Sequence, residues 1–256
     1  MSISVLVVLY NSAVNDVPVL QTALHSQQVS DIVVCDNSDR KNDNAEQAAC
    51  HNITYISMNG NKGLSKAYNA GVVRCRGDIV CVFDDDTQVD GDYFNAVSEL
   101  TESSQKWDIA LPIVMTGDKV LSPSHFEKYR TIPVDPSHVG DMADLTGINS
   151  GMAVRRSLYD RISYDSNLFL DLIDHQFILD ARKVGANIVV LKGSRLHQSY
   201  SLENDSLKNA RKRLGIFERD AKYFYSSSLV SKLYCRIMLL GRKLKLCIQY
   251  KTFSFL

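Results

Sequence analysis

An apolar run that ends in three consecutive carboxylates constrains the fold of this chain more than any other stretch. Residues 80–83 are apolar, and Asp84, Asp85 and Asp86 follow them directly. Burial of an unpaired carboxylate costs on the order of several kcal/mol, so the triplet must lie at the mouth of a strand, facing water or a cation. Hard divalent cations such as Mg²⁺ and Mn²⁺ prefer carboxylate oxygens and often share them with substrate phosphates. The run therefore predicts a metal site for a phosphorylated substrate.

Two other interpretations of the triplet are weaker. A solvated acidic turn would suit three Asp residues in a random loop, but here Gly77-Asp78-Ile79 marks the start of a strand, and open α/β sheets bind ligands beyond the carboxyl ends of their strands. The aspartate-rich motif of prenyl-diphosphate enzymes lies on a helix in an all-α protein. The strand-like run before Asp84 argues against that class.

Strand-like and helix-like segments alternate through the first half of the chain. Apolar runs typical of strands cover residues 3–9, 32–35, 53–56, 79–83 and 109–114, and helical spacing covers 16–26, 62–73 and 93–100. Residues 40–50 are interpreted as a polar loop. This alternation predicts an α/β protein with a doubly wound, mostly parallel sheet. Asn11, Asp36, Asn59 and Asp84 each follow a predicted strand, so one edge of the sheet has the polar groups that a nucleotide site requires.

The second half of the chain is less regular. Residues 115–146 are expected to be loops and short strands, 148–154 a short strand, 172–183 a helix and 188–191 a strand. From residue 207 onward the chain is expected to be helical. A length of 256 residues suits one large domain, or one domain with an appendage. We expect a catalytic domain over residues 1–205 and a helical, basic region over residues 206–256.

Charge is distributed unevenly although the formal net charge is zero. No acidic residue follows Asp220, whereas seven basic residues do: Lys222, Lys232, Arg236, Arg242, Lys243, Lys245 and Lys251. The tail thus has a charge of +7, which the rest of the chain balances. Such asymmetry indicates contact with an anionic surface.

The cysteines and the apolar segments bear on the compartment. The six cysteines show no C-x-x-C pairing, and Cys35 and Cys81 lie in apolar runs typical of core thiols. A reducing compartment fits this pattern. Residues 1–10 lack a basic start and are too short for a signal peptide, and no run of about 18 apolar residues is present. We therefore expect a cytoplasmic protein.

Several short motifs occur in an order that resembles a known family. They are Tyr10-Asn11, Cys35-Asp36-Asn37-Ser38, Asn61-Lys62-Gly63, Tyr68-Asn69-Ala70-Gly71, Asp84-Asp85-Asp86, Asn149-Ser150-Gly151, Asp171-Leu172-Ile173-Asp174 and Leu196-His197. Over about residues 3–200 the chain resembles the family 2 glycosyltransferases, which have the GT-A fold. Within that family it is most similar to bacterial rhamnosyltransferase-like enzymes of polysaccharide assembly.

The resemblance implies a set of residues that bind the donor nucleotide sugar. They are Tyr10, Asn11, Asp36, Asn61, Gly63, Asn69, Asp84 and Asp85. From the residues alone, Asp36 fits a turn as well as a base contact. Asn61 and Gly63 fit ordinary helix capping as well as a donor site, although a helix N-terminus also stabilises anions.

The resemblance also implies a Mg²⁺ or Mn²⁺ site formed by Asp86, Asp84 and His197. Successive side chains in a strand point to opposite faces, so Asp84 and Asp86 do not have to be equivalent. In the family pattern Asp86 is the more direct ligand and Asp84 contacts the sugar. A lone histidine is more often structural, and that interpretation of His197 stays open.

The acceptor side follows from the same resemblance. It implies that Asp174 is the general base, and that Ser150, Gly151 and Asp171 contact the acceptor. Carboxylates at the start of a helix are also ordinary caps. Gln176 occupies a position where the family frequently has Glu, which casts doubt on any role that needs a charge at residue 176.

The function that the resemblance implies is an inverting, metal-dependent transfer of a sugar to a hydroxyl of a growing bacterial surface polysaccharide or O-antigen. The expected donor is dTDP-rhamnose, followed by UDP-galactofuranose and UDP-glucose. A sugar nucleotidyltransferase would need a Gly-rich, basic phosphate loop where Tyr10-Asn11-Ser12-Ala13 stands. A non-catalytic binding protein would not need Asp84, Asp86 and Asp174 together.

The tail offers two interpretations of its own. Leu229, Leu233, Ile237, Leu240 and Leu244 share one helical face, and Lys232, Arg236 and Lys243 lie elsewhere on the helix. Such a helix suits the inner face of an anionic membrane, near a lipid-linked glycan acceptor. It suits equally well packing on the catalytic domain or on a second copy in a homo-oligomer. Nucleic acid is not among the expected partners.

Overall fold

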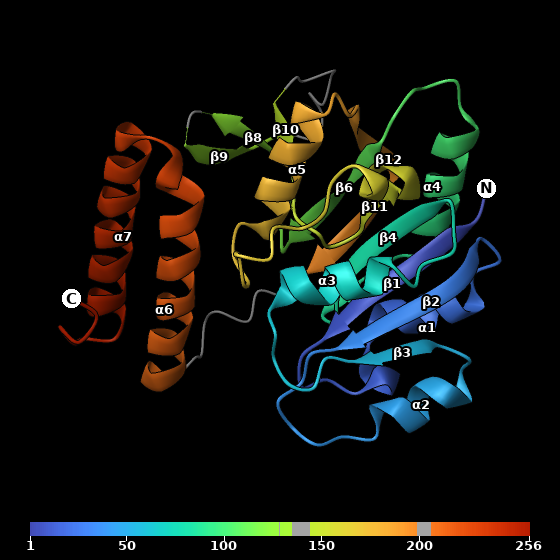
Figure 1. Ribbon diagram of the computed structural model, residues 1–256, viewed down its shortest axis with the longest axis horizontal. Helices are drawn as coiled ribbons and strands as arrows, with labels where there is room; N and C mark the ends of the chain where they lie inside the picture. Colours follow the sequence, from blue (N-terminus) through green and yellow to red (C-terminus); the bar gives the residue numbers. More distant parts are fainter. Residues whose placement is uncertain (128, 135–143, 199–205) are drawn as a thin grey trace.

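The computed structural model describes residues 1–127, 129–134, 144–198 and 206–256. Within these residues, nine strands form one twisted sheet in the order β3-β2-β1-β4-β11-β6-β12-β5, with β7 beside β6 (Figure 1). The strands are β1 (Ile3–Leu9), β2 (Val29–Asp36), β3 (Thr54–Ser57), β4 (Ile79–Asp84), β5 (Thr87–Gln88), β6 (Ile109–Thr116), β7 (Lys119–Ser122), β11 (Met152–Arg155) and β12 (Ile188–Gln198). β1 to β4 are parallel, as are β6 and β12, while β11 runs antiparallel between β4 and β6.

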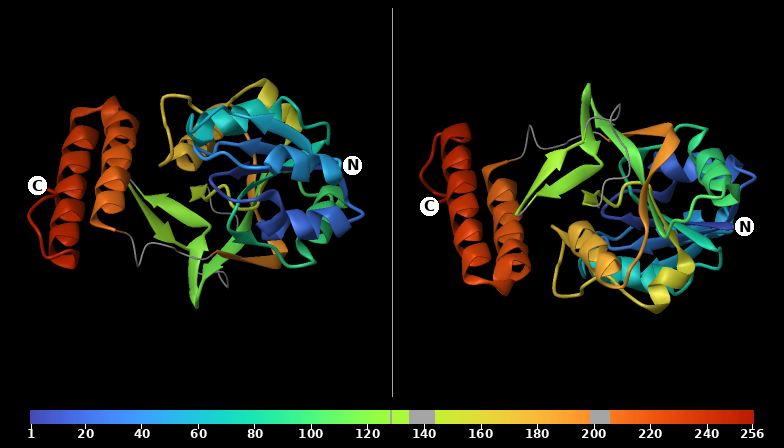
Figure 2. Two further views of the ribbon diagram at one scale, coloured as in Figure 1. Left: turned by 90° about the horizontal axis from the view of Figure 1, so that it is seen from below. Right: turned by 90° about the horizontal axis from the view of Figure 1, so that it is seen from above.

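Helices cover both faces of this sheet, which is seen edge-on in Figure 2. They are α1 (Pro18–His25), α2 (Asn44–Cys50), α3 (Leu64–Val72), α4 (Tyr93–Glu102) and α5 (Ile173–Lys183), with short 3₁₀ turns at Val14–Asp16 and Arg156–Asp160. A small antiparallel sheet of β8 (Ser124–Glu127), β9 (Arg130–Pro133) and β10 (Leu145–Thr146) lies beside them. The architecture is the α/β, mostly parallel sheet that the sequence predicts.

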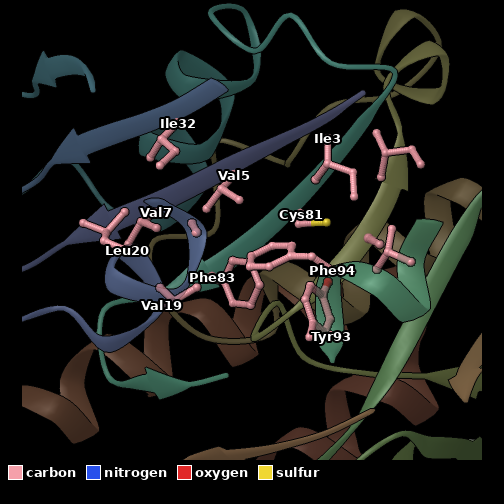
Figure 3. Packing of buried hydrophobic residues seen from close by; sticks show 14 of the residues in the cluster. Ile3, Val5, Val7, Val19, Leu20, Ile32, Cys81, Phe83, Tyr93 and Phe94 are labelled. Carbon is pink, nitrogen blue, oxygen red and sulfur yellow. The ribbon is translucent and has the colours of Figure 1, made fainter. Parts of the chain in front are cut away.

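Two hydrophobic cores occupy the two faces of the sheet. Alternate residues of β1 enter different cores: Val5 and Val7 pack with α1 and α4, whereas Leu6 and Val8 pack with α3 and α5. Figure 3 shows the first core, where Phe83 of β4 meets Phe94 of α4. A central strand buried on both faces is almost entirely apolar, which explains the run at residues 3–9. Its one polar residue, Ser4, is buried, and its hydroxyl donates to Asp31 at 2.6 Å.

The structure corrects the prediction for residues 40–50, which contain helix α2 rather than only a polar loop. Buried Asn44 holds this helix against the sheet: its Oδ1 accepts from the Val14 amide, and its Nδ2 donates to the Ser12 carbonyl and to Asp36. These partners are distant in sequence, so local pattern does not reveal them. Elsewhere the strands at 32–35 and 188–191 prove longer, as β2 and β12, and the strand at 148–154 is shorter, as β11.

The C-terminal region is a helical hairpin of α6 (Leu207–Phe224) and α7 (Leu229–Gln249), joined by a 3₁₀ turn at Tyr225–Ser227. The side-chain oxygens of Ser206 and Ser228 cap the two helices by accepting backbone amides. Buried Phe217, Ala221 and Tyr225 of the first arm pack against Cys235 and Leu239 of the second. In every view α6 lies between α7 and the sheet, so α7 is the outermost element (Figures 1 and 2).

A buried carboxylate joins α6 to the segment before α5. Asp220 is fully buried, and its Oδ2 accepts hydrogen bonds from the backbone amides of Phe169, Leu170 and Asp171 at 3.1, 2.8 and 3.0 Å. Its Oδ1 accepts from the Arg219 guanidinium at 2.9 Å. These hydrogen bonds satisfy the carboxylate away from water and fix the loop in one position.

We expect Asp220→Asn to lower the free energy of unfolding by about 2–3 kcal/mol, because hydrogen bonds to a charged group are worth about that much. Urea denaturation of the purified protein measures the change. Glu218→Gln is the matched control on the same helix, since Glu218 makes surface ion pairs with Lys222 and Lys243, and such pairs contribute less than about 1 kcal/mol. Equal stability of the two variants would contradict the role given to Asp220.

Candidate active site

A cleft of about 720 Å³ opens at the carboxyl ends of β1 and β4. It contains predicted site residues from four separate segments: Tyr10, Asn11, Asn61, Asp84, Asp85, Asp86 and Asp174. Two turns of α6 contribute the facing wall through Asn209, Lys212, Arg213 and Ile216, which the spacing i, i+3, i+4, i+7 places on one side of the helix. The sheet edge and the C-terminal hairpin therefore build the cleft together.

Asp84 is held in place by two hydroxyl groups. Tyr68 donates to its Oδ1 at 2.7 Å, and Ser150 donates to its Oδ2 at 3.1 Å. Burial, together with the neighbouring charges of Asp86 and Asp85, raises the pKa of Asp84 to about 6, even though the two hydroxyl groups act in the opposite direction. The carboxylate is thus fixed in orientation and is under electrostatic stress that a nearby cation would relieve.

Asp85 and Asp86 have different surroundings. Asp85 Oδ2 accepts from the Tyr10 amide at 2.9 Å and from the Ser12 hydroxyl at 2.6 Å, which ties the end of β4 to the end of β1. Asp86 Oδ1 accepts from the Gln198 amide group at 3.2 Å, and burial raises the pKa of Asp86. Of the three, Asp85 has the most clearly structural contacts.

The carboxylates fit a divalent cation that shares its coordination with a substrate. In the described part of the chain, no three His, Cys, Asp or Glu side chains are grouped so as to enclose a metal ion. Mg²⁺, however, is usually bound by one or two carboxylates plus substrate phosphates and water. Asp86, with Asp84 beside it at the same cleft, meets that lower requirement.

His197 does not line the cleft, whereas its neighbour Gln198 does. Both lie in β12, where Gln198 pairs with Thr87 and His197 with Gln88. Since successive side chains of a strand point to opposite faces, the hydrogen bond from Gln198 to Asp86 directs His197, which is exposed, to the other side. The metal ligation by His197 remains a prediction, and Gln198 is the residue of β12 that contacts Asp86.

The donor-side residues Tyr10, Asn11 and Asn61 form a polar floor. The Tyr10 side chain is 41% exposed at the cleft, and its hydroxyl donates to Asp39 at 2.9 Å. Asn11 adopts a left-handed backbone with φ of 61° where β1 ends. Asn61 Oδ1 accepts from the Gly63 amide at 3.0 Å and from the Asn37 side chain at the same distance. These contacts hold the loop before α3 close to the sheet.

Asp36, Gly63 and Asn69 lie outside the cleft lining. Asn69 exchanges two hydrogen bonds with the backbone of Tyr164. Gly63 has φ of +93°, and a Cβ there would meet Phe169 at 2.7 Å, so this position accommodates only glycine. Each of the three has a visible structural function, and their predicted contacts with the donor stay predictions.

Asp36 is 4% exposed and lies within a network of donors. Its carboxylate accepts from the Ser38 amide, the side chains of Asn42 and Asn44, and the Tyr55 hydroxyl. Burial acts to raise the pKa of Asp36, but the hydrogen bonds from Ser38, Asn44 and Tyr55 outweigh it and lower the pKa below its usual value.

On the acceptor side, Asp174 lines the cleft from the first turn of α5. Its Oδ1 accepts from the His175 amide at 2.8 Å. Asp171 is instead engaged by both guanidinium nitrogens of Arg213. Ser150 donates to Asp84, and Gly151 has φ of +79° with Leu196 where a Cβ would be. Of the four predicted residues on this side, Asp174 is the one in the cleft lining.

Several residues that line the cleft were not predicted. They are Asn37, Arg40, Asn149, Gln198, Asn209, Lys212 and Arg213. The basic run Arg211-Lys212-Arg213 was a visible signal, but the sequence does not show that this helix folds back onto the sheet. Strand alternation offered a second signal, because it makes residues 197 and 198 mutually exclusive as cleft residues.

Comparison with known proteins points to one enzyme family. The family model described as glycosyl transferase family 2 matches residues 4–162. No protein among those with curated descriptions matches significantly. The identification of a family therefore rests on the sequence model, which covers more than half of the chain.

Solved structures share the fold at low sequence identity. GalNAc-T7, determined with UDP, GalNAc and Mn²⁺, has 14% identity and a TM-score of 0.63, covering 88% of this chain and 50% of its own. Staphylococcus aureus TarS, determined with UDP, has 16% identity and a TM-score of 0.58, and the match covers 93% of this chain and 70% of TarS. A mannosyltransferase from Pyrobaculum calidifontis, determined with GDP-Man and Mn²⁺, has 13% identity and a TM-score of 0.58. The match covers 93% of this chain and 69% of the mannosyltransferase. This chain spans half the length of GalNAc-T7. The expected GT-A fold is confirmed.

Asp36→Asn should lower the free energy of unfolding by about 2 kcal/mol at pH 7, since it removes a buried, hydrogen-bonded charge. The folded state lowers the pKa of Asp36, so this stabilisation is complete above the unfolded value of about 3.9. It is lost as the pH falls through the folded value, and the difference between wild type and variant should shrink at pH 3. Urea denaturation at pH 7 and at pH 3 measures the difference in free energy of unfolding between wild type and variant. Asp43→Asn, an exposed neighbour, should change stability little at either pH, and an identical result for the two variants would contradict the prediction.

Proposed function

We propose that this chain, which belongs to glycosyl transferase family 2, transfers a sugar from a nucleotide diphosphate sugar to a hydroxyl group of an acceptor, with inversion at the anomeric carbon. One observation supports this most directly. A single cleft has the carboxylates Asp84, Asp86 and Asp174 on the sheet side and the cations Lys212 and Arg213 on the α6 side. Such a cleft can hold both a diphosphate and the groups that act on it.

The donor would lie along the end of β1. The exposed ring of Tyr10 offers a flat apolar surface for a base, and Asn11 and Asn61 offer hydrogen bonds to polar atoms of the nucleoside. Arg40 and Lys212 also face the cleft and provide positive charge for the phosphates. Asp36, buried behind this wall, would support the donor side rather than form the surface of the cleft.

A bound Mg²⁺ or Mn²⁺ would be held by Asp86, with Asp84 beside it, and would supply Lewis-acid neutralisation of the leaving diphosphate. The chain's own residues prepare this place. Tyr68 and Ser150 orient Asp84, and Gln198 orients Asp86. His197 would need a different conformation of β12 to join Asp84 and Asp86, because successive side chains of a strand point to opposite faces and Gln198 is the one that contacts Asp86.

The chemical step assigns the base to Asp174. Its carboxylate accepts the proton of the acceptor hydroxyl while that oxygen forms a bond to the anomeric carbon. The bond from this carbon to the diphosphate oxygen breaks, and its electron pair leaves with the diphosphate. A single displacement inverts the configuration. Asp171 would act through its ion pair with Arg213, which positions the cation of the opposite wall.

For the donor we propose dTDP-rhamnose first, since the order of the motifs resembles that of rhamnosyltransferase-like enzymes, followed by UDP- and GDP-sugars. The structural relatives bind UDP and GDP-Man. The proposed acceptor is a hydroxyl of a bacterial surface glycan. A thermal-shift panel of these donors with Mn²⁺ tests the choice, because a ligand at about 100 times its Kd adds about 2.7 kcal/mol of stability. The catalytic domain is proposed to cover residues 1–205, with α6 completing its cleft.

Asp86→Asn should abolish transfer almost completely and remove the dependence of donor binding on Mn²⁺, because the variant loses the charge that would hold the cation. The measurement is the thermal shift caused by the best donor, with Mn²⁺ and with EDTA, together with transfer activity. Asp85→Asn is the matched control. Its contacts are structural, so a milder effect is expected. Full activity in excess EDTA would refute the metal requirement.

Asp174→Asn should lower kcat about 10²–10⁴-fold while the affinity for the donor stays within about twofold, because the amide keeps the shape and cannot accept a proton. Asp180→Asn on the same helix serves as the control, since Asp180 bonds Gln176 and Lys183. Stopped reactions under saturating donor give kcat. If the Asp174 variant keeps wild-type kcat, the base lies elsewhere.

A further inference from the structure

The outer face of α7 is a continuous apolar stripe in contact with solvent. Its members recur every three or four residues, and about half or more of each residue's surface is exposed to solvent, which is a large share for aliphatic residues. They are Val230 (62%), Leu233 (58%), Ile237 (63%), Leu240 (53%), Leu244 (46%) and Ile248 (79%), and we call them the outer stripe. Apolar patches of this kind mark contact sites on proteins or membranes.

No described part of the chain covers the outer stripe. α7 packs on α6 through its opposite face, where Ser231, Cys235, Leu239 and Cys247 are buried. Figures 1 and 2 place α7 on the side of α6 that lies away from the sheet. Among the described residues, the contact of α7 with residues 1–205 is made by Tyr234, whose ring centroid lies 5.3 Å from that of Tyr129, and not by the outer stripe.

Basic side chains flank the outer stripe on both sides. At 100° per residue, Arg236 lies along one side of the stripe and Lys245 along the other. Arg236, Lys245, Lys232 and Lys251 are exposed. Of the remaining tail cations, Lys222 and Lys243 pair with Glu218, and Arg242 lies over the Phe217 ring at 3.9 Å. No acidic residue follows Asp220.

This charge pattern decides between two occupants of the stripe. A second copy of α7 would bring Arg236 and Lys245 against identical cations, with no acidic residue on the helix to pair with them. An anionic lipid surface would instead take the apolar stripe into its acyl boundary and attract the basic flanks. None of the described helices is long and apolar enough to cross a bilayer.

We infer that α7 lies in the interface of an anionic membrane, with the outer stripe inserted and its basic flanks on the lipid head groups. The inference concerns a surface separate from the cleft and does not depend on sugar transfer. It has a geometric consequence. α6 faces α7 on one side and the cleft on the other, so the cleft lies about 20 Å, the thickness of two helices, from the membrane.

Vesicle sedimentation of the full chain tests this inference. The probes are phosphatidylcholine vesicles and vesicles of equal parts phosphatidylcholine and phosphatidylglycerol, at low and at high salt. One variant replaces Lys232, Arg236 and Lys245 with Gln, and another replaces Leu233, Ile237 and Leu240 with Gln. The matched control replaces three exposed basic residues outside the tail, Lys66, Arg74 and Lys106, with Gln. Circular dichroism and light scattering verify the fold and the mass of each protein.

The expected result is binding to the anionic vesicles that high salt weakens and that the control variant retains. Each basic residue near the surface contributes about fivefold, so the tail charge variant should partition about 100-fold less. The stripe variant should lose binding while remaining folded. Absence of binding by the wild type overturns the inference, as does equal binding by the stripe variant. A dimer that disappears in the stripe variant, without vesicle binding, would assign the face to a second copy.

Discussion

The buried carboxylate of Asp220 is the interaction on which the arrangement of the cleft depends. It accepts hydrogen bonds from the amides of Phe169, Leu170 and Asp171. Two carbonyls of the same loop accept from α3: the Phe169 carbonyl from the Leu64 amide, and the Leu168 carbonyl from the Ser65 hydroxyl. The loop is thereby fixed between two helices that are far apart in sequence. α5 begins directly after it, so the position of Asp174 follows from these contacts.

Electrostatic balance across the cleft gives this arrangement its chemical character. Burial, and after it the charges of neighbouring carboxylates, raises the pKa of Asp84 and of Asp86 at the end of β4. Positive charge nearby would stabilise their ionised forms. The opposite wall supplies Lys212 and Arg213, the latter already committed to Asp171. A ligand with both a diphosphate and a cation would satisfy the two walls together, which is why the geometry favours a nucleotide sugar over a neutral metabolite.

How much of this the sequence predicted depended on the range of the contacts involved. The strands and the polar edge followed from local pattern, because a doubly buried strand such as β1 is mostly apolar and polar residues come directly after it in the sequence. Helix α2 was missed because Asn44 makes its hydrogen bonds to Ser12, Val14 and Asp36. The cations of α6 were missed as cleft residues for the same reason. The contact of Gln198 with Asp86 was not predicted, because it depends on how β12 pairs with β5, and this register is not written in a single strand.

The two turns of α6 that face the cleft bear on how the ligand preference of such a protein can change. Asn209, Lys212, Arg213 and Ile216 line the cleft from a helix whose attachment depends on Asp220, about one turn beyond Ile216. Recognition and anchorage thus reside in separate turns of one element. Substitutions among the cleft-facing residues could change which ligand is bound, while Asp220 keeps the helix attached and the sheet unaltered. For protein engineering, these four cleft-facing positions of α6 are a natural first target for a focused library.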